Sequence, residues 1–204
     1  MKPFFILLII VFSFSLKAFE LQSGDIILIS FNCYECRVIE SETNSPFSHS
    51  GVVVKNEKGE LMVAQSLTTV RLSSLQDFLK NKTPKSSASV LRAYELENRI
   101  DFIEIEKSMR EKFEVYFRGL PFDSNYFWNN FDDKGRELLY CSEFVAKFLD
   151  HFLTTPSIVF PLTYQKNYDY WFKYFNGQIP EGEIGNSPAS FSTDPRFHLV
   201  GTLN

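Results

Sequence analysis

The sequence has few of the residues on which several common protein classes depend. Among 204 residues there are three cysteines, and 21 lysines and arginines stand against 25 acidic residues. Three cysteines cannot build the disulfide framework of a small secreted scaffold, and they leave one pair and an odd thiol at most. The net charge of −4 offers no basic surplus to neutralise phosphates, so we expect no nucleic-acid partner. Gly-rich phosphate loops and EF-hand loops are also missing, and we expect no cofactor and no bound metal.

Long apolar runs are equally scarce. The one such run, residues 4–16, falls short of the roughly 20 residues that span a bilayer. Lys2 precedes this run, and Ala18 follows it as a small residue suited to cleavage. These features predict a signal peptide over residues 1–18, although an uncleaved membrane anchor would have a similar pattern. We therefore expect a periplasmic or secreted protein, cleaved near Ala18, without a transmembrane segment and in a compartment that permits disulfides.

Aromatic residues are abundant, with 22 phenylalanines, and they provide the material for one well-packed domain over residues 19–204. Short β-branched or alternating runs predict strands at residues 25–31, 51–55, 61–65, 70–72, 90–94 and 197–201. Apolar residues three and four positions apart predict helices over residues 75–79 and 100–117, and another that begins near Cys141. The order of elements predicts an α+β domain with an antiparallel sheet packed on helices.

Two stretches give weaker patterns. Residues 32–46 are polar and predict a single helical turn at most. The tail from Thr154 is rich in Pro, Gly, Asn and Ser with interleaved aromatic residues, and no helical periodicity stands out in it before the late strand.

Cys141 is the first candidate for chemistry. The apolar stripe that follows it places it at the start of a helix, where unpaired amides and the helix dipole favour a thiolate. A thiolate is the nucleophile that acyl transfer requires. A buried, unreactive cysteine is the alternative, because cysteine is among the most buried residue types.

His49 and Gln65 are the candidates for its partners. His49 lies between two serines at the start of a predicted strand, where it could accept the thiol proton. Gln65 ends the next strand of the hairpin, and its carbonyl could orient the imidazole. Taken alone, His49 fits a hydrogen-bonded turn histidine better than a catalytic one, and Gln65 could equally be a polar residue of a strand end. We expect a structural role for His151, at a helix end, and a solvent-facing side chain for His198, which alternates with Phe197 and Leu199 on a late strand.

Cys33 and Cys36 form a single Cys-x-x-Cys pair. No second pair and no nearby histidine complete a zinc site. The polar stretch after Cys36 predicts no helix long enough for a thioredoxin-like redox fold. In an oxidising compartment, a disulfide that closes a small loop is favoured.

Four segments, read in order, resemble a known family. They are Gly24-Asp25-Ile26, Ser48-His49-Ser50-Gly51, Gly119-Leu120-Pro121-Phe122-Asp123 and Tyr140-Cys141-Ser142-Glu143. Together they are similar to the YiiX/YebB-like permuted papain-fold hydrolases of the NlpC-type superfamily, which are related to lecithin:retinol acyltransferase-like proteins. The resemblance covers about residues 21–201. It implies a circularly permuted papain-like fold in which the histidine precedes the nucleophile, as His49 precedes Cys141. The family's third polar residue, often Glu, corresponds here to Gln65.

The resemblance implies an exported cysteine hydrolase that cleaves an amide or ester bond. Its partner would be a small peptide or acyl-amide substrate, drawn from a cell-wall peptide or a lipid. In this interpretation Cys141 attacks the carbonyl, His49 acts as base and then acid, and Gln65 orients His49. Two alternatives remain: a catalytically weak binding protein, indicated by the neutral Gln65, and a thiol-disulfide redox protein that uses Cys33 and Cys36.

Overall fold

The computed structural model describes residues 19–204. The signal peptide expected over residues 1–18 lies outside them. Within the part of the chain that is described, no helix combines the length and the apolar composition needed to cross a membrane.

A six-stranded antiparallel sheet forms the centre of the structure, with strands in the order β10-β5-β1-β2-β3-β4. The strands are β1 (Ile26–Ile29), β2 (His49–Lys55), β3 (Leu61–Ser66), β4 (Val70–Ser73), β5 (Ala88–Ala93) and β10 (Phe197–Leu203). These are the strands that the β-branched and alternating runs predict, and the β2–β3 hairpin is confirmed by its register, with Val53 opposite Val63. The prediction of an antiparallel sheet is correct.

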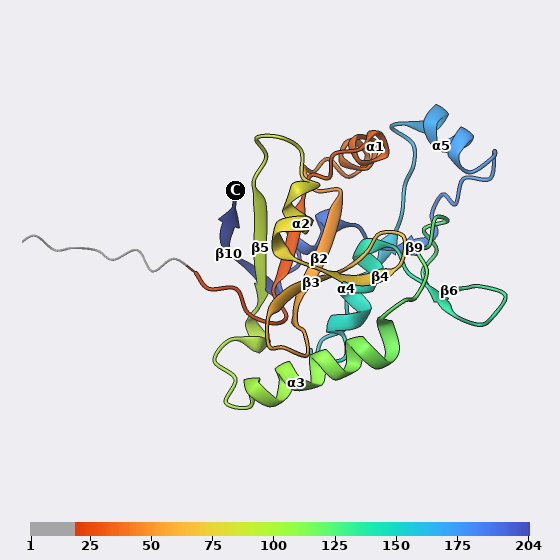
Figure 1. Ribbon diagram of the computed structural model, residues 1–204. Helices are drawn as coiled ribbons and strands as arrows, with labels where there is room; N and C mark the ends of the chain where they lie inside the picture. The colour runs from red at the N-terminus through yellow and green to blue at the C-terminus, as the bar shows by residue number, and fades with distance from the viewer. Residues whose placement is uncertain (1–18) are drawn as a thin grey trace, which may run out of the picture.

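Helices cover both faces of this sheet (Figure 1). On one face lie α4 (Cys141–Leu149) and α3 (Phe102–Lys112), the latter continued by a π-helical turn (Phe113–Phe117). The other face is covered by α2 (Leu75–Lys80), through Phe78. Shorter elements complete the fold: the 3₁₀ turn η1 (Tyr94–Leu96), the strand pairs β6 (Asn130–Phe131) with β7 (Glu137–Leu138) and β8 (Phe160–Pro161) with β9 (Ile184–Gly185), and α6 (Pro188–Phe191).

The apolar stripe of α4 explains where this helix packs. Phe144, Val145 and Phe148 are fully buried, and they join Val52 and Val54 of β2 in one hydrophobic cluster. Burying side chains of this size contributes roughly 1.5–3 kcal/mol each. The packing fixes the first residue of α4, Cys141, at the end of the sheet where β2 begins.

A ten-residue helix, α1 (Tyr34–Thr43), occupies the segment for which we expected one turn at most. That expectation is wrong. The helix buries Cys36, Val38 and the acidic Glu42, so its inner face has too few apolar residues to show a helical period. The expected disulfide between Cys33 and Cys36 is present at its start.

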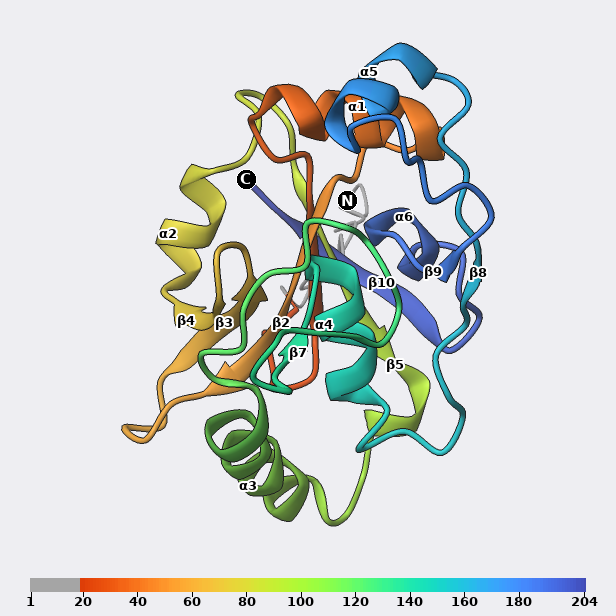
Figure 2. The ribbon, with the colours of Figure 1, turned by 90° about the vertical axis from the view of Figure 1, so that its right-hand side faces the viewer.

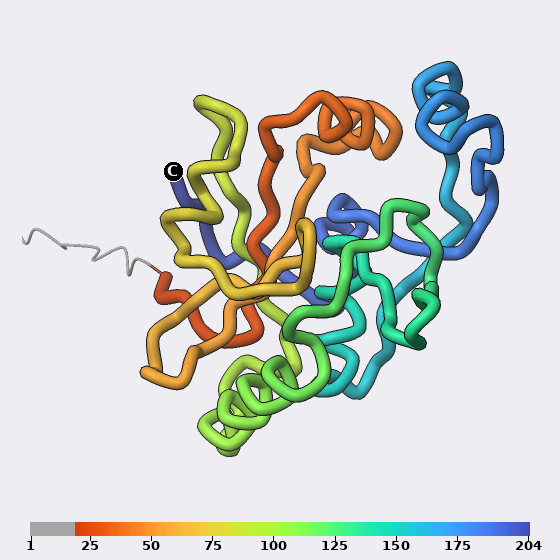
Figure 3. The backbone as a smooth tube through the Cα atoms, turned by 45° about the vertical axis from the view of Figure 1, so that its right-hand side comes forward, coloured from red at the N-terminus to blue at the C-terminus, as the bar shows by residue number. Residues whose placement is uncertain are grey.

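A second unexpected helix, α5 (Tyr168–Tyr174), lies beside α1 (Figure 2). Val38 of α1 packs with Tyr164 and Trp171 in a small aromatic cluster. The tube view shows the consequence for the chain path (Figure 3). The first half of the described chain forms most of the sheet, the second half builds the opposite side, and β10 returns to the sheet edge beside β5.

Candidate active site

The β2–β3 hairpin brings His49 and Gln65 together. His49 Nε2 lies 2.8 Å from Gln65 Oε1 in a buried hydrogen bond. Gln65 Nε2 in turn donates to Ser73 Oγ of β4 at 2.7 Å. Because Gln65 accepts from Nε2, the neutral imidazole carries its proton there and has Nδ1 as its remaining acceptor. Ser73 was missed by the sequence reasoning, since nothing distinguishes it from an ordinary strand serine until β4 pairs with β3.

Two aromatic rings enclose the imidazole. The ring centroids of Phe31 and Phe78 lie 5.1 and 5.6 Å from that of His49. The approach of Phe78 depends on Gly51, because a Cβ there would lie 2.5 Å from Val63 and 3.0 Å from Phe78. Burial among these groups lowers the pKa of His49 to about 4, and the hydrogen bond to Gln65 offsets only part of this effect. The imidazole is therefore neutral at pH 7.

Cys141 begins α4, as the sequence predicts. The segment before it is held against β3 because Ser66 Oγ donates to the carbonyl oxygen of Leu139 at 2.6 Å. Burial raises the pKa of the Cys141 thiol to about 11. The amides of Ser50, Ser142 and Cys141 itself, with the Ser50 hydroxyl, favour the thiolate but only partly offset that burial. The expected resting thiolate is therefore not supported, because burial outweighs the helix N-terminus.

His49 and Cys141 approach the start of β2 from its two sides. Side chains alternate along a strand, so His49 lies on the side of Phe78 and α2, while Ser50 lies on the side of α4. Cys141 contacts Ser50, the residue next to His49. The structure thus brings the His49–Gln65 pair and Cys141 to neighbouring positions, and no hydrogen bond directly joins thiol and imidazole within residues 19–204.

A cavity of about 80 Å³ adjoins Cys141. Its wall combines α1, α5, the loop before β6 and the segment between β9 and α6, through residues such as Ile39, Tyr126, Leu162, Tyr164, Trp171 and Asn186. A wider hollow of about 500 Å³ shares Glu42, Thr43, Leu162, Thr163 and Ser187 with it. Cys141 therefore lines the smaller of two adjoining hollows, and the wider one offers room for a substrate beside it.

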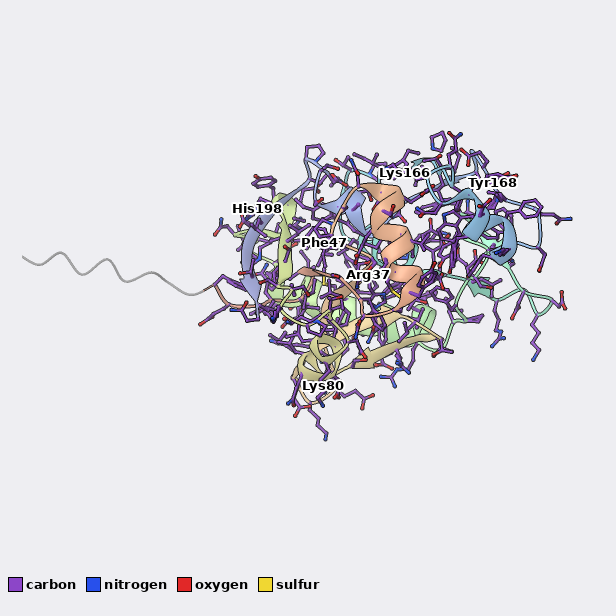
Figure 4. All side chains as sticks on the ribbon, turned by 90° about the horizontal axis from the view of Figure 1, so that it is seen from above. Arg37, Phe47, Lys80, Lys166, Tyr168 and His198 are labelled. Atoms are coloured by element: carbon purple, nitrogen blue, oxygen red, sulfur yellow. A yellow bond between two sulfur atoms is a disulfide. The ribbon has the colours of Figure 1, made fainter. Side chains whose placement is uncertain are left out.

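The remaining candidates have structural surroundings. His198 lies on β10 at the sheet edge (Figure 4), where its ring packs on Tyr94 and its Nε2 lies 3.0 Å from Glu97. His151 packs against Phe117, at the end of α4 away from Cys141. Asp25 is buried and pairs with Arg92 at 2.7 Å. None of these residues lines the cavity beside Cys141.

The comparisons with known proteins agree with this geometry. A family model described as permuted papain-like amidase enzyme, YaeF/YiiX, C92 family, matches residues 20–201. The chain belongs to this family. The resemblance to the YiiX-like family and the permuted papain-like fold that it implies are therefore confirmed.

A solved structure has the same fold. The crystal structure of the metalloprotein yiiX from Escherichia coli O157:H7 superposes with a TM-score of 0.74 at 22% sequence identity. The match covers 89% of this chain and 97% of that one. No match was found among curated proteins. Within residues 19–204 no three His, Cys, Asp or Glu side chains gather closely enough to bind a metal ion, so the described residues do not fit a metal site.

Proposed function

We propose that this C92-family protein is an exported cysteine hydrolase that cleaves an amide bond through a thioester on Cys141. The observation that carries the proposal is the His49–Gln65 hydrogen bond of 2.8 Å, beside a helix N-terminus that bears the chain's one free cysteine within residues 19–204. Gln65 holds Nε2 and leaves Nδ1 as the proton acceptor, which is the arrangement a Cys–His pair requires.

The steps follow from these positions. In the free protein the thiol contacts Ser50, so the reaction requires Sγ to turn toward the imidazole. His49 Nδ1 then takes the thiol proton as Cys141 Sγ attacks the carbonyl carbon and the tetrahedral oxyanion forms. The amides of the first turn of α4 have no side-chain cap, and that of Cys141 can donate to the oxyanion. His49 then gives its proton to the leaving amine, and the C–N bond breaks to leave a thioester. Water, deprotonated by His49, hydrolyses the thioester and restores the thiol.

The substrate in this proposal is a cell-wall peptide or an acyl chain linked to an amine. The predicted signal peptide, residues 1–18, would export the protein to the periplasm or the outside. Cys33 and Cys36 would then have a structural role, which is supported by their position at the start of α1 rather than beside Cys141.

A catalytically weak binding protein is the second candidate, and one observation favours it. Burial favours the neutral forms of both His49 and Cys141, and the neutral Gln65 supplies no charge to stabilise an imidazolium. A protein that retains the cavity but has lost proton transfer would show the same features.

The test is to trap the thioester. The protein is mixed with peptide amides and with N-acyl amines, quenched in acid after milliseconds to seconds, and digested for mass spectrometry. The hydrolase proposal expects the acyl group on the peptide that contains Cys141, and no adduct in Cys141→Ala. Saturable binding without any adduct or released amine, over the whole panel, would favour the binding protein instead.

A further inference from the structure

Buried polar atoms without hydrogen-bond partners are concentrated at the cavity beside Cys141. Within residues 19–204 seven side-chain atoms are buried and unpartnered. Four of them belong to cavity residues: Ser142 Oγ, Tyr164 Oη, Trp171 Nε1 and Asn186 Oδ1. These side chains are all at least nine-tenths buried. Because an unpaired buried polar group is costly, so many at one small site indicate a ligand that pairs with them.

Asn186 is held in a defined orientation between the neighbours of the nucleophile. Its backbone N–H donates to Tyr140 Oη at 3.0 Å, and its Nδ2 donates to the carbonyl oxygen of Ser142 at 3.1 Å. Tyr140 and Ser142 are the residues on either side of Cys141. The hydrogen bond from Nδ2 leaves Oδ1 as the free acceptor of the amide.

Trp171 supplies a hydrogen-bond donor, whereas Asn186 supplies an acceptor. An indole Nε1–H can only donate a hydrogen bond, and this one has no partner among the described residues. The cavity therefore offers a strict acceptor, Asn186 Oδ1, and a strict donor, Trp171 Nε1, with two hydroxyls that can do either. An amide group, which has both an N–H and a carbonyl oxygen, is complementary to this set.

The cavity does not favour an anionic group. Its acidic residue, Glu42, already accepts hydrogen bonds with both carboxylate oxygens, from the Lys166 amide at 2.8 Å and from Asn167 Nδ2 at 2.8 Å. Figure 4 shows Lys166 beside α1, the helix that carries Glu42. Both of these donors are neutral, so Glu42 keeps its negative charge, which disfavours a buried carboxylate of a ligand beside it.

We propose that Asn186 and Trp171 form a subsite for an uncharged amide group of the substrate. Asn186 Oδ1 accepts from the amide N–H, and Trp171 Nε1 donates to the amide carbonyl oxygen. Both atoms are shielded from water in the free protein. Binding therefore requires Asn186 to loosen its hydrogen bond to Ser142 and Trp171 to shift within its aromatic cluster. This subsite rests on the proposed hydrolase function, and it favours peptide-like substrates over plain acyl chains.

Three small alkylating agents test the subsite at Cys141 without a known substrate. In each reaction the sulfur–carbon bond forms as iodide leaves. Iodoacetamide carries a neutral amide, iodoacetate carries a charge, and allyl iodide carries neither. Second-order rate constants are divided by those for a free small thiol. We expect the normalised iodoacetamide rate to exceed the other two by at least about tenfold, since each hydrogen bond of about 1 kcal/mol corresponds to roughly fivefold.

Two variants separate recognition from structure. Asn186→Leu and Trp171→Phe should each lower the iodoacetamide rate about fivefold and leave the allyl iodide rate within about twofold. Asn81→Leu, at the exposed end of α2, and Trp128→Phe, outside the cavity wall, are matched controls that should change neither rate. Should Asn186→Leu fail to fold, Trp171→Phe still carries the test.

The possible results are distinct. A reactive Cys141 with equal normalised rates for all three agents would overturn the subsite and leave the hydrolase proposal standing. Variants that slow iodoacetamide and allyl iodide equally would assign Asn186 and Trp171 a purely structural role and also overturn it. A Cys141 that reacts with no agent would contradict the hydrolase proposal itself.

Discussion

The two sides of β2 differ in how completely their polar groups are paired. On the α2 side, His49, Gln65 and Ser73 form an unbroken chain of hydrogen bonds among aromatic rings. On the α4 side, Asn186, Trp171 and their neighbours around the cavity keep polar atoms without partners. In our account, the first side is organised before substrate arrives, while the second is completed by the substrate.

The two sides also differ in how far apart their residues lie along the sequence. The paired side is built from three consecutive strands, β2, β3 and β4, so its residues lie close in sequence. The cavity side combines α1, α4, α5 and the segment before α6, which lie far apart in sequence. Local hairpins suit a residue whose orientation must be fixed, and segments from distant parts of the chain suit a surface that adapts to a ligand.

The largest effect is expected from replacing the nucleophile Cys141, which lies between the two sides. Cys141→Ala should reduce amide turnover by at least about 10³-fold, because no other thiol can form the thioester. The double variant Cys33→Ser, Cys36→Ser should retain most of the turnover. Steady-state kinetics of the three proteins check this, and equal losses in both variants would favour a redox role for the Cys-x-x-Cys pair.

The burial of His49 should make the free energy of unfolding depend on pH. Its pKa falls from 6.5 to about 4 on folding, so the unfolded chain binds the proton more tightly. The contribution of His49 to the free energy of unfolding is complete above pH 6.5. About 3 kcal/mol of it is lost as the pH falls toward 4. Urea titrations of the wild type and His49→Gln at pH 7 and pH 4 measure it as a difference in the pH dependence of the free energy of unfolding.

That difference isolates His49 because other groups are common to both proteins. Burial raises the pKa of Glu143 to about 7, which gives stability that is present at low pH and lost as the pH rises through 7. This contribution has the opposite sign and cancels between the wild type and His49→Gln. Identical pH dependence in the two proteins would show that the imidazole is not buried in its neutral form.

Substitutions of Gln65 test directly whether the hydrogen-bonded side orients His49. Gln65→Ala should lower kcat by roughly 10–100-fold, or about 1.4–2.7 kcal/mol, and leave KM nearly unchanged. Ser73→Ala should have a smaller effect, because Ser73 acts only through Gln65. Gln65→Glu restores an acid and should raise kcat above that of Gln65→Ala. Wild-type kcat in all three variants would mean that His49 is oriented by another group.

The smallest effect is expected from removing the disulfide, and it concerns stability. The Cys33–Cys36 bridge closes a loop of four residues, for which the chain-entropy estimate is about 2 kcal/mol at most. Thermal unfolding of the double serine variant should show this loss while the cavity keeps its preference for iodoacetamide. Loss of that preference would show that the bridge also shapes the cavity, through α1.

The sequence predicted the parts of the fold whose apolar patterns are strong. Strands such as β1 and β2 are continuous β-branched runs, and α4 has a clear apolar stripe, so the positions of His49 and Cys141 at the ends of these elements could be anticipated. The helix α1 could not, because its inner face buries Glu42 and few apolar residues. Ser73, Trp171 and Asn186 carry no local signal, since their roles depend on contacts between distant segments. The raised pKa of Cys141 was missed for the same reason: burial is a property of the packed domain.

The most direct test of the central claim, that His49 activates Cys141, is the rate constant for alkylation of Cys141 by iodoacetamide at pH 7 in the wild type and in His49→Ala. Burial alone holds the thiol neutral, with a pKa of about 11, so rapid alkylation requires a base. The account predicts that His49→Ala lowers this rate constant by at least about tenfold, as expected for the loss of a general base. Equal rate constants in the two proteins would contradict it.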